Sequence, residues 1–406
     1  MRGKARTVIS EVPIHETPGD RVKMMRRRAG LTQVDLARRV GRTQGWVSQV
    51  ERGDIELDKV SVVNELARAL HCHPRELTTT PGFGEDGERG HATAIELVRL
   101  LRRLDLPPER DTHRPLPQLE ADLVELGRLR GLARYTDLGE RAADVIVHLH
   151  AASAVPAVRE REAAFSLLVR VCKEVHSFAY GLGYPNLVEL ATWRARWSAE
   201  RSNDPLLPAI GDYLAARDAW TTADWQDAMI LVDRALATVG AASASAEDAS
   251  SLVGALQLRA AITAARANDA DEAYSRLDAA GEAAGRVRVD RYGNWFSLGN
   301  VSLHGVAVAV ELGDGVEAVR RSRDLVLPAD VPASRLAHYF LDTARGFVWV
   351  GDVERGLAAL ERADRAAPQL VRNHPMAQAT VRSLLRAERR STRERLRRMA
   401  TRLHVE

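Results

Sequence analysis

The residues best suited to recognition chemistry lie on one face of a short segment near the N-terminus. In the stretch from Thr43 to Gly53, Val47 and Val50 are at helical spacing, so both would face inward and hold a helix against a domain. The opposite face then carries Thr43, Gln44, Trp46 and Gln49. Hydroxyl and amide groups on such a helix can hydrogen-bond base edges in the major groove of DNA. The segment therefore predicts a recognition helix.

Two other motifs would point to different chemistry, and neither has the context it needs. His71-Cys72-His73 offers metal-ligating side chains, but no second ligand pair lies at usable spacing, so a small core residue is the better interpretation of Cys72. A Gly-x-Gly-x-x-Gly run begins at Gly82, but no strand precedes it and its flank is acidic, so residues 78–90 are interpreted as a linker. No catalytic motif is present either. We expect no enzyme activity, no catalytic residue, no metal and no cofactor.

The recognition helix needs a partner helix and a tight turn, and the preceding residues supply both. Thr32 followed by Asp35 is typical of a capping box at a helix start. Gly41 can take the left-handed conformation that ends this helix. Further helices are expected over residues 20–28, 58–70 and 73–77. The five helices predict a compact DNA-binding domain, and the alternative is a similar stretch inside a bundle that does not bind DNA.

Residues 31–53 resemble the helix-turn-helix of the XRE (Cro/C1-type) family. They match Leu-Thr-Gln-x-x-Leu-Ala-x-x-x-Gly, then a small hydroxyl residue, then x-x-x-Val-x-x-Val-Glu-x-Gly, and the resemblance extends over about residues 19–77. It implies DNA contacts by Gln33, Arg42, Thr43, Gln44, Gly45, Trp46, Gln49 and Arg52.

The resemblance also implies individual roles for these residues. Gln33 would lie near a phosphate, while Gln44 and Gln49 would read adenine through paired hydrogen bonds. Trp46 would pack on a thymine methyl group. Gly45 departs from the family, which usually has a polar side chain there; it removes one base contact and costs roughly 1 kcal/mol of helix propensity.

Composition favours a large helical protein. The chain has 406 residues, 45% apolar and only 5% aromatic, so two to three domains built from helices are expected. The net charge is +3, and residues 20–80 hold 12 basic and 8 acidic side chains, which supports phosphate attraction in this part. The two cysteines suggest no disulfide framework. With no signal peptide and no apolar run that could span a membrane, a cytoplasmic location is expected.

Internal repeats organise the rest of the chain. Turns with a small or polar residue recur with spacings of 38, 45, 45 and 38 residues, and their markers are Asn186, Asp224, Asp269, Asp314 and Asp352. Each marker follows a long apolar helix and is followed four or five residues later by Ala or Gly. Paired helices of this kind cannot bury their apolar faces alone, so they stack into a curved solenoid with a concave groove. Residues 340–368 resemble a tetratricopeptide (TPR) repeat, and a basic helix over 382–402 is expected to cap the stack.

If each marker lies at a hairpin turn, the preceding helix lines the groove. Helical spacing then puts these candidate ligand contacts on the groove face: Arg217, Trp220, Arg259, Asn300, His304, His338, Arg345 and Trp349. Arginine forks suit carboxylates and tryptophan suits apolar groups, so the set predicts an extended or anionic ligand. The alternative is a solvated face whose arginines lie over apolar surface.

The combination resembles XRE–TPR regulators of the RRNPP type and related actinobacterial regulators. The resemblance implies an all-α fold, with a five-helix DNA-binding domain and a TPR-like right-handed α-solenoid. The expected parts are a flexible arm (1–18), the DNA-binding domain (19–77), a linker and connecting helix (78–116) and a ligand-sensing and dimerisation domain (117–406). The expected function is a transcriptional regulator that binds an inverted-repeat operator in double-stranded DNA as a homodimer. A peptide or small-molecule signal would control it. The alternative is an adaptor whose repeats recruit a protein partner to DNA.

Overall fold

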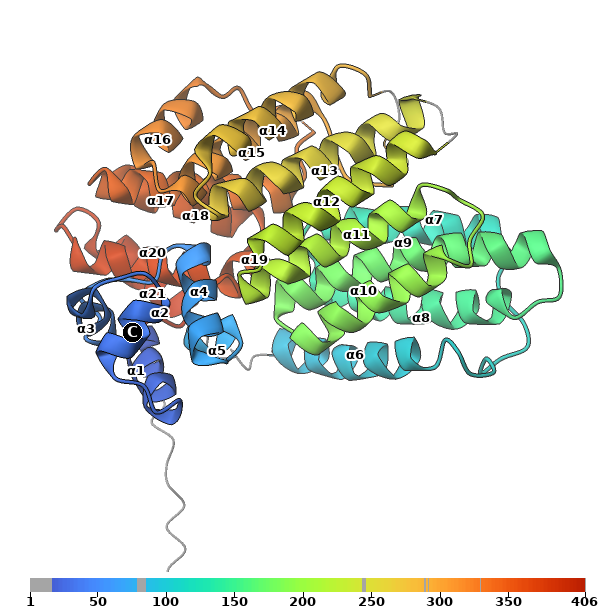
Figure 1. The fold of residues 1–406 in the computed structure, drawn as a ribbon, viewed down its shortest axis with the longest axis horizontal. Helices are drawn as coiled ribbons and strands as arrows, with labels where there is room; N and C mark the ends of the chain where they lie inside the picture. The colour runs from blue at the N-terminus through green and yellow to red at the C-terminus, as the bar shows by residue number, and fades with distance from the viewer. Residues whose placement is uncertain are drawn as a thin grey trace, which may run out of the picture.

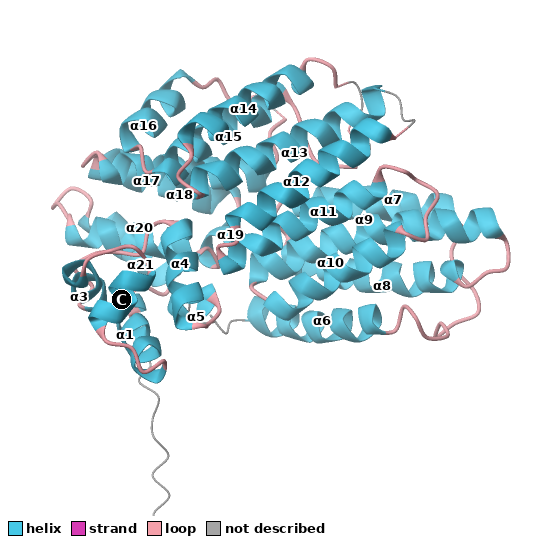
Figure 2. Cartoon of the chain, in the orientation of Figure 1, coloured by secondary structure: helices cyan, strands magenta, loops and turns pink. Residues whose placement is uncertain are grey.

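The computed structural model describes residues 17–78, 85–242, 246–287, 290, 292–328 and 330–405. Every regular element within these ranges is a helix, and none is a strand (Figure 2). Residues 1–16 of the predicted arm and 79–84 of the predicted linker lie outside the described residues. The end of the arm instead starts a helix, with Thr17 as its N-cap, and residues 85–90 of the predicted linker are helical. None of the described helices is both long and apolar enough to cross a membrane. The predicted all-α class is confirmed.

Five helices form the N-terminal domain. Their bounds are α1 (Pro18–Arg28), α2 (Gln33–Arg39), α3 (Gln44–Glu51), α4 (Val60–Leu70) and α5 (Pro74–Thr78). Thr32 and Asp35 form the predicted capping box, and the Thr43 hydroxyl accepts a hydrogen bond from the Trp46 N–H at the start of α3. Gly41 ends its helix with a left-handed φ of 63°. The expected helix order is therefore confirmed.

Some boundaries differ by one or two residues: α1 begins at Pro18 rather than at residue 20, and α5 is Pro74–Thr78 rather than 73–77. Helix α4 begins at Val60 rather than at Asp58, and its N-cap residue Lys59 makes no side-chain cap. The Asp58 carboxylate, one residue before the N-cap, accepts a hydrogen bond from Trp349 Nε1 at 2.6 Å. The residue expected to start the helix is thus held by the distant C-terminal part.

The rest of the chain is a curved stack of helical pairs (Figure 1). Its first half comprises α6 (Glu85–Arg102), α7 (Leu116–Gly131), α8 (Tyr135–Ser153), α9 (Val158–Leu182), α10 (Pro185–Ala199), α11 (Leu207–Asp218), a 3-10 turn (Ala219–Thr222) and α12 (Trp225–Ala241). Its second half comprises α13 (Ala246–Arg266), α14 (Ala270–Ala284), α15 (Leu298–Leu312), α16 (Gly315–Asp324), α17 (Ala333–Trp349), α18 (Val353–Ala366), α19 (Pro368–Arg372), α20 (Pro375–Arg386) and α21 (Arg393–Arg402).

The repeat markers lie where the second helix of a pair begins. The N-cap residues of α12, α14, α16 and α18 are Asp224, Asp269, Asp314 and Asp352. Three of these carboxylates accept a hydrogen bond from the backbone N–H three residues later, which satisfies a free donor of the first turn. The fifth marker differs: Asn186 lies inside α10, whose N-cap residue is Tyr184.

The stack curves until its two ends touch. Arg130 in α7 donates to the Gly293 carbonyl, and Gln369 in α19 accepts a hydrogen bond from the Tyr135 N–H at 2.6 Å. The N-terminal domain lies beside the last helices of this curve, next to α20 (Figure 1). The curve and the N-terminal domain together enclose the space described below.

The basic C-terminal segment is two helices rather than the one expected, because the backbone leaves helical geometry between Arg386 and Arg393. The second, α21, packs on the stack through ion pairs from Arg395 to Glu361 and from Arg402 to Asp364. The first, α20, instead contacts the N-terminal domain. The arginines of the two helices therefore contact different parts of the protein.

Candidate nucleic-acid interface and central cavity

Helix α3 lies at the outer end of the molecule (Figure 1), and most of its polar face is exposed to solvent. Trp46 is partly buried, and Arg42 lies over its ring with 5.7 Å from Cζ to the ring centroid. The exposed members of the predicted DNA-contact set are Arg42, Thr43, Gln44, Gly45, Gln49 and Arg52. The helical stack therefore leaves this face free for a partner.

A chain of buried and half-buried polar groups holds this face in place. Glu51 is buried and forms a two-pronged ion pair with Arg26, with oxygen–nitrogen distances of 2.5 and 3.0 Å. The Gln33 amide donates to Glu51 at 2.9 Å, and the Gln44 amide donates to the Gln33 oxygen at 2.7 Å. Burial alone would raise the pKa of Glu51, but the hydrogen bonds from Arg26 and Gln33 keep it below its ordinary value. The carboxylate is therefore ionised and orients both glutamines.

Arg52 is the member of the set most engaged within its own domain. Its guanidinium donates to Asp54 at 2.8 Å and to the Ser48 hydroxyl at 2.7 Å. A neighbouring carboxylate offsets the positive charge that would attract a phosphate. The structure thus places Arg52 beside the recognition face with its charge already paired.

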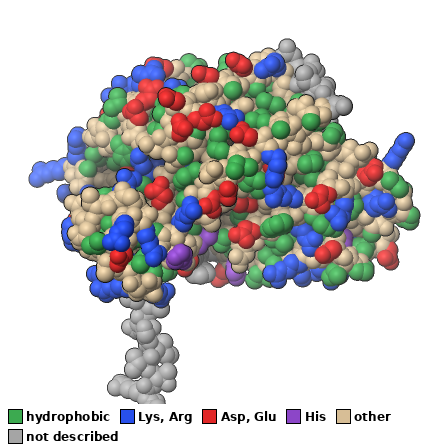
Figure 3. All heavy atoms as spheres, in the orientation of Figure 1, with side chains coloured by type: hydrophobic (Ala, Val, Ile, Leu, Met, Phe, Trp, Pro, Cys, Tyr) green, Lys and Arg blue, Asp and Glu red, His purple; other side chains and the backbone are tan. Residues whose placement is uncertain are grey.

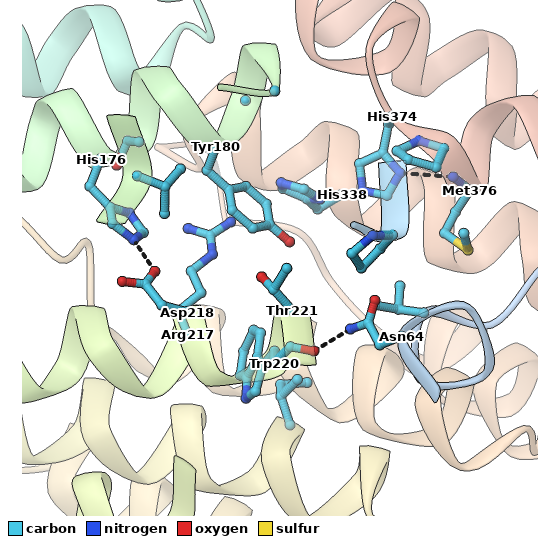
Figure 4. Close-up of a pocket in the computed structure, with 18 of the residues that line it drawn as sticks. Asn64, His176, Tyr180, Arg217, Asp218, Trp220, Thr221, His338, His374 and Met376 are labelled. Carbon is cyan, nitrogen blue, oxygen red and sulfur yellow. Dashed lines mark hydrogen bonds and ion pairs between the residues drawn. The ribbon is translucent and has the colours of Figure 1, made fainter. Parts of the chain in front are cut away.

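A cavity of about 840 Å³ lies between the N-terminal domain and the inner face of the stack. Helices α4 and α5 form one wall, and the first helices of successive pairs, including α9, α11, α13, α15 and α17, form the other. Figure 4 shows side chains from both walls facing this space, with Asn64 of α4 opposite Trp220. The cavity is therefore shared by the two parts of the chain.

Seven of the eight predicted ligand contacts line this cavity, and they are Arg217, Trp220, Arg259, Asn300, His304, His338 and Arg345. Trp349 does not, since the next turn of α17 carries it to the N-terminal domain and its ring lies 5.9 Å from Lys59 Nζ. The cavity gathers side chains that are far apart in sequence. Whether they bind a ligand stays a prediction.

The arginines of the cavity fall into two groups. Arg266 pairs with Glu311 at 3.2 Å, and Arg345 pairs with Asp342 at 3.0 Å. Arg217, Arg259 and Arg335 have no carboxylate within 4.0 Å among the described residues, and Arg217 and Arg259 lie over the aromatic rings of Tyr180 and Tyr213. Positive charge is therefore concentrated in one part of the cavity.

This charge changes the acidity of neighbouring groups. Burial alone would raise the pKa of Tyr213, but Arg259 and Arg335 lower it to about 7. Burial, with a further contribution from Arg335, lowers the pKa of His304 to about 3. His338 is likewise held well below its ordinary pKa by burial first and then by charge. At neutral pH both histidines are uncharged.

Sequence reasoning missed some residues that line the cavity. Arg335 lies three residues before His338 and ten before Arg345, so it belongs to the same face of α17. Extending that stripe by one turn would have found it. Tyr180 near the end of α9 gave no such signal, because the curvature that brings α9 opposite α17 is not encoded locally.

Comparison with known proteins identifies the N-terminal part. Residues 19–79 match a family model described as a helix-turn-helix domain. This part is a helix-turn-helix domain. A search of curated proteins finds no match for the chain.

Two solved structures are similar to the chain over most of its length. One is PlcR of Bacillus thuringiensis in complex with the peptide PapR7 and DNA, which is 12% identical, with 85% of this chain and 99% of that chain covered and a TM-score of 0.35. The other is a tyrosine-to-cysteine mutant of PrgX, which is 9% identical, with 86% and 94% covered and a TM-score of 0.22.

Proposed function

We propose that the protein is a cytoplasmic, sequence-specific transcriptional regulator whose helical stack binds a peptide or small-molecule signal and thereby controls DNA binding. One observation carries this proposal. Helix α4 of the helix-turn-helix domain is a wall of the cavity, with Val60, Asn64 and Arg68 among its lining residues. A molecule bound there would contact both the stack and the DNA-binding part.

The DNA-binding role is supported by the exposed face of α3. Gln44 and Gln49 offer amide groups that can pair with adenine, and Trp46 offers an apolar surface for a thymine methyl group. The polar chain from Arg26 through Glu51 fixes the face on a rigid element, as precise base contacts require. We further propose that two copies act together on an inverted repeat, so that the separation of their recognition helices sets the half-site spacing.

Control by a signal is supported by the bonds that join the two parts beside the cavity. Asn64 Nδ2 donates to the Trp220 carbonyl at 2.5 Å, and Arg68 pairs with Asp224 at 3.0 Å. A signal that favours one placement of α4 over another shifts the equilibrium between them by its differential affinity. The placement of α3 for a DNA half-site would change with it.

A second set of bonds holds the segment that precedes α4. Arg345 Nη2 donates to the Asp58 carbonyl at 2.7 Å, and Arg382 of α20 donates to Glu56 at 2.9 Å. Arg345 also lines the cavity, so a ligand near it would compete for the same donor groups. The link between α3 and α4 is thus tied to the cavity wall.

The test is a mobility-shift titration of the full-length protein on its own promoter region, over a range of salt, with and without concentrated culture-medium extract. We expect a specific shift whose midpoint changes with extract. Gln44→Ala should weaken the specific shift, while Arg320→Gln, an exposed change on α16, should behave like the natural chain.

A specific shift that is indifferent to extract would contradict signal control and favour the adaptor hypothesis. The absence of any specific shift would contradict the DNA-binding role.

A further inference from the structure

The charge inside the cavity differs from the charge on the outside of the stack. Nine lysine and arginine side chains line the cavity against five carboxylates. On the face drawn in Figure 3, basic and acidic side chains are mixed over the stack. The cavity therefore carries a positive excess that this face of the stack does not show, in a place where water screens charge less.

Three arginines, on α11, α13 and α17, contribute to this excess without a carboxylate partner among the described residues. Arg217 of α11 lies over the Tyr180 ring with 3.4 Å from Cζ to the centroid, and Arg259 of α13 lies over the Tyr213 ring at 4.0 Å. Arg335 of α17 donates to the Asn294 carbonyl at 3.4 Å. Each is close enough to the others for their charges to interact, and burial lowers the pKa of Arg335 to about 10. These three form what we call the arginine cluster.

Among the described residues no carboxylate pairs with the cluster, whose neighbours are the Tyr180 and Tyr213 side chains. The Nε atoms of Arg217 and Arg259 are buried without a hydrogen-bond partner in the described part of the chain, and Arg259 is only 8% exposed. Asn300, which is 2% exposed and lines the same cavity, likewise has an unpartnered amide oxygen. Burying a cation without a carboxylate is costly, so an arrangement of three such groups calls for an anion.

The wall next to the cluster is apolar. Leu258 and Ile262 of α13 and Leu303 and Ala307 of α15 line the cavity on the turns that flank Arg259 and Asn300. The space of about 840 Å³ is far larger than one oxyanion needs. The site therefore suits a molecule with one charged end and an apolar body.

We propose that the arginine cluster binds the carboxylate or phosphate group of an amphipathic anion whose apolar part lies along α13 and α15. This rests on the proposed function, since it names the chemical class of the signal. Guanidinium groups bind such oxyanions through two parallel hydrogen bonds, and the aromatic rings beneath them fix their planes. The same chemistry is offered by a small acid or by the free C-terminus of an apolar peptide.

The test measures binding to the full-length protein without DNA, by calorimetry and by thermal melting at constant ionic strength. The probes are inorganic phosphate, octanoate, and trileucine with a free C-terminus, with octanamide and amidated trileucine as neutral counterparts. We expect saturable binding of phosphate and of at least one carboxylate, and none of the neutral forms. Whether octanoate or trileucine binds more tightly distinguishes a small acid from a peptide terminus.

Variants locate the binding. Arg259→Gln and Arg335→Gln should each raise the dissociation constant for the anion by about tenfold to a hundredfold, the loss of affinity expected for charge-assisted hydrogen bonds. Arg362→Gln is the matched control, because Arg362 lies over the Phe340 ring at 4.1 Å but outside the cavity. Arg335 is only partly buried, so its variant remains informative if Arg259→Gln fails to fold.

Three results would overturn the inference. They are no binding of any anion beyond that of matched sodium chloride, equal binding of octanamide and octanoate, or an equal loss in Arg362→Gln. Because these measurements contain no DNA, they separate the two proposals. If the protein binds anions but extract does not change its affinity for DNA, only signal control is contradicted. If extract changes DNA affinity but no anion binds, only the arginine cluster as an anion site is contradicted.

Discussion

The Tyr213 hydroxyl offers a direct measure of the charge inside the cavity. Burial would raise its pKa above 10, but the positive charges of Arg259, Arg335, Lys173 and Arg217 lower it to about 7. At pH 8, one unit above this value, about nine-tenths of the side chain is ionised. A tyrosine in water is almost entirely neutral at that pH, so we expect Tyr213 to be ionised where an ordinary tyrosine is not.

The measurement is an ultraviolet absorbance titration of the folded protein. The chain has seven tyrosines, so about one-seventh of the total tyrosinate signal should develop between pH 6 and pH 8. Tyr213→Phe should remove this step. Tyr274→Phe is the control, because burial raises the pKa of Tyr274, which does not line the cavity. Arg217 and Arg266 also lower the pKa of Tyr180 against its burial, so a smaller signal can remain in the variant. A natural chain with no tyrosinate below pH 9, or a step of undiminished size in Tyr213→Phe, would refute the reasoning.

The ionisation of Tyr213 also predicts how the free energy of unfolding and the affinity for anions change with pH. A pKa that is lower in the folded chain than in the unfolded chain makes the free energy of unfolding rise with pH between the two values, here from about 7 to about 10. This rise should be absent in Tyr213→Phe. A tyrosinate also repels a bound oxyanion, so anion affinity should fall as pH rises from 6 to 8 in the natural chain and should fall less in the variant.

Three other changes test separate parts of the structure. Gln44→Ala should cost about 1–3 kcal/mol in binding free energy on the specific operator and little on random DNA, measured by parallel mobility-shift titrations; an equal loss on both would sink the base-reading role. Glu51→Ala leaves Arg26 as a buried unpaired cation and should lower the free energy of unfolding of the N-terminal domain by about 3–5 kcal/mol in denaturant titrations, whereas a change under 1 kcal/mol would contradict the importance of the pair. Trp349→Phe keeps the ring but removes the hydrogen bond to Asp58, so it should reduce the effect of extract on DNA affinity; an unchanged response would exclude this bond from the coupling.

Much of the N-terminal domain could be predicted from sequence because its signals are local. A threonine followed three residues later by an acidic residue, as in Thr32 and Asp35, caps a helix through bonds that need no other part of the chain. A glycine such as Gly41 ends a helix for a reason that its own backbone supplies. The aspartate markers of the stack predicted helix starts correctly for the same reason. Asn186 did not mark a helix start, because α10 begins one residue earlier at Pro185.

Contacts between distant segments could not be predicted in this way. Helical spacing correctly put Arg345 and Trp349 on one face of α17, but it could not tell where along that face the cavity ends and the N-terminal domain begins. Asp58 is 291 positions from Trp349, and only the curvature of the whole stack brings them together. The buried pair of Arg26 and Glu51 was missed because charged residues are expected at the surface unless a partner is known.

The position of Arg345 explains how a charge in the cavity could reach the DNA-binding part. Its guanidinium is buried, bonds to Asp342 at 3.0 Å and to the Asp58 carbonyl at 2.7 Å, and retains an unpartnered Nε. An anion that approaches this group would lower the positive charge available to the Asp58 carbonyl and weaken that bond. By linkage, if such an anion changes operator affinity by some factor, the operator must change anion affinity by the same factor. Arg345, which contacts both parts, is therefore the residue through which we propose that the cavity and the N-terminal domain are coupled.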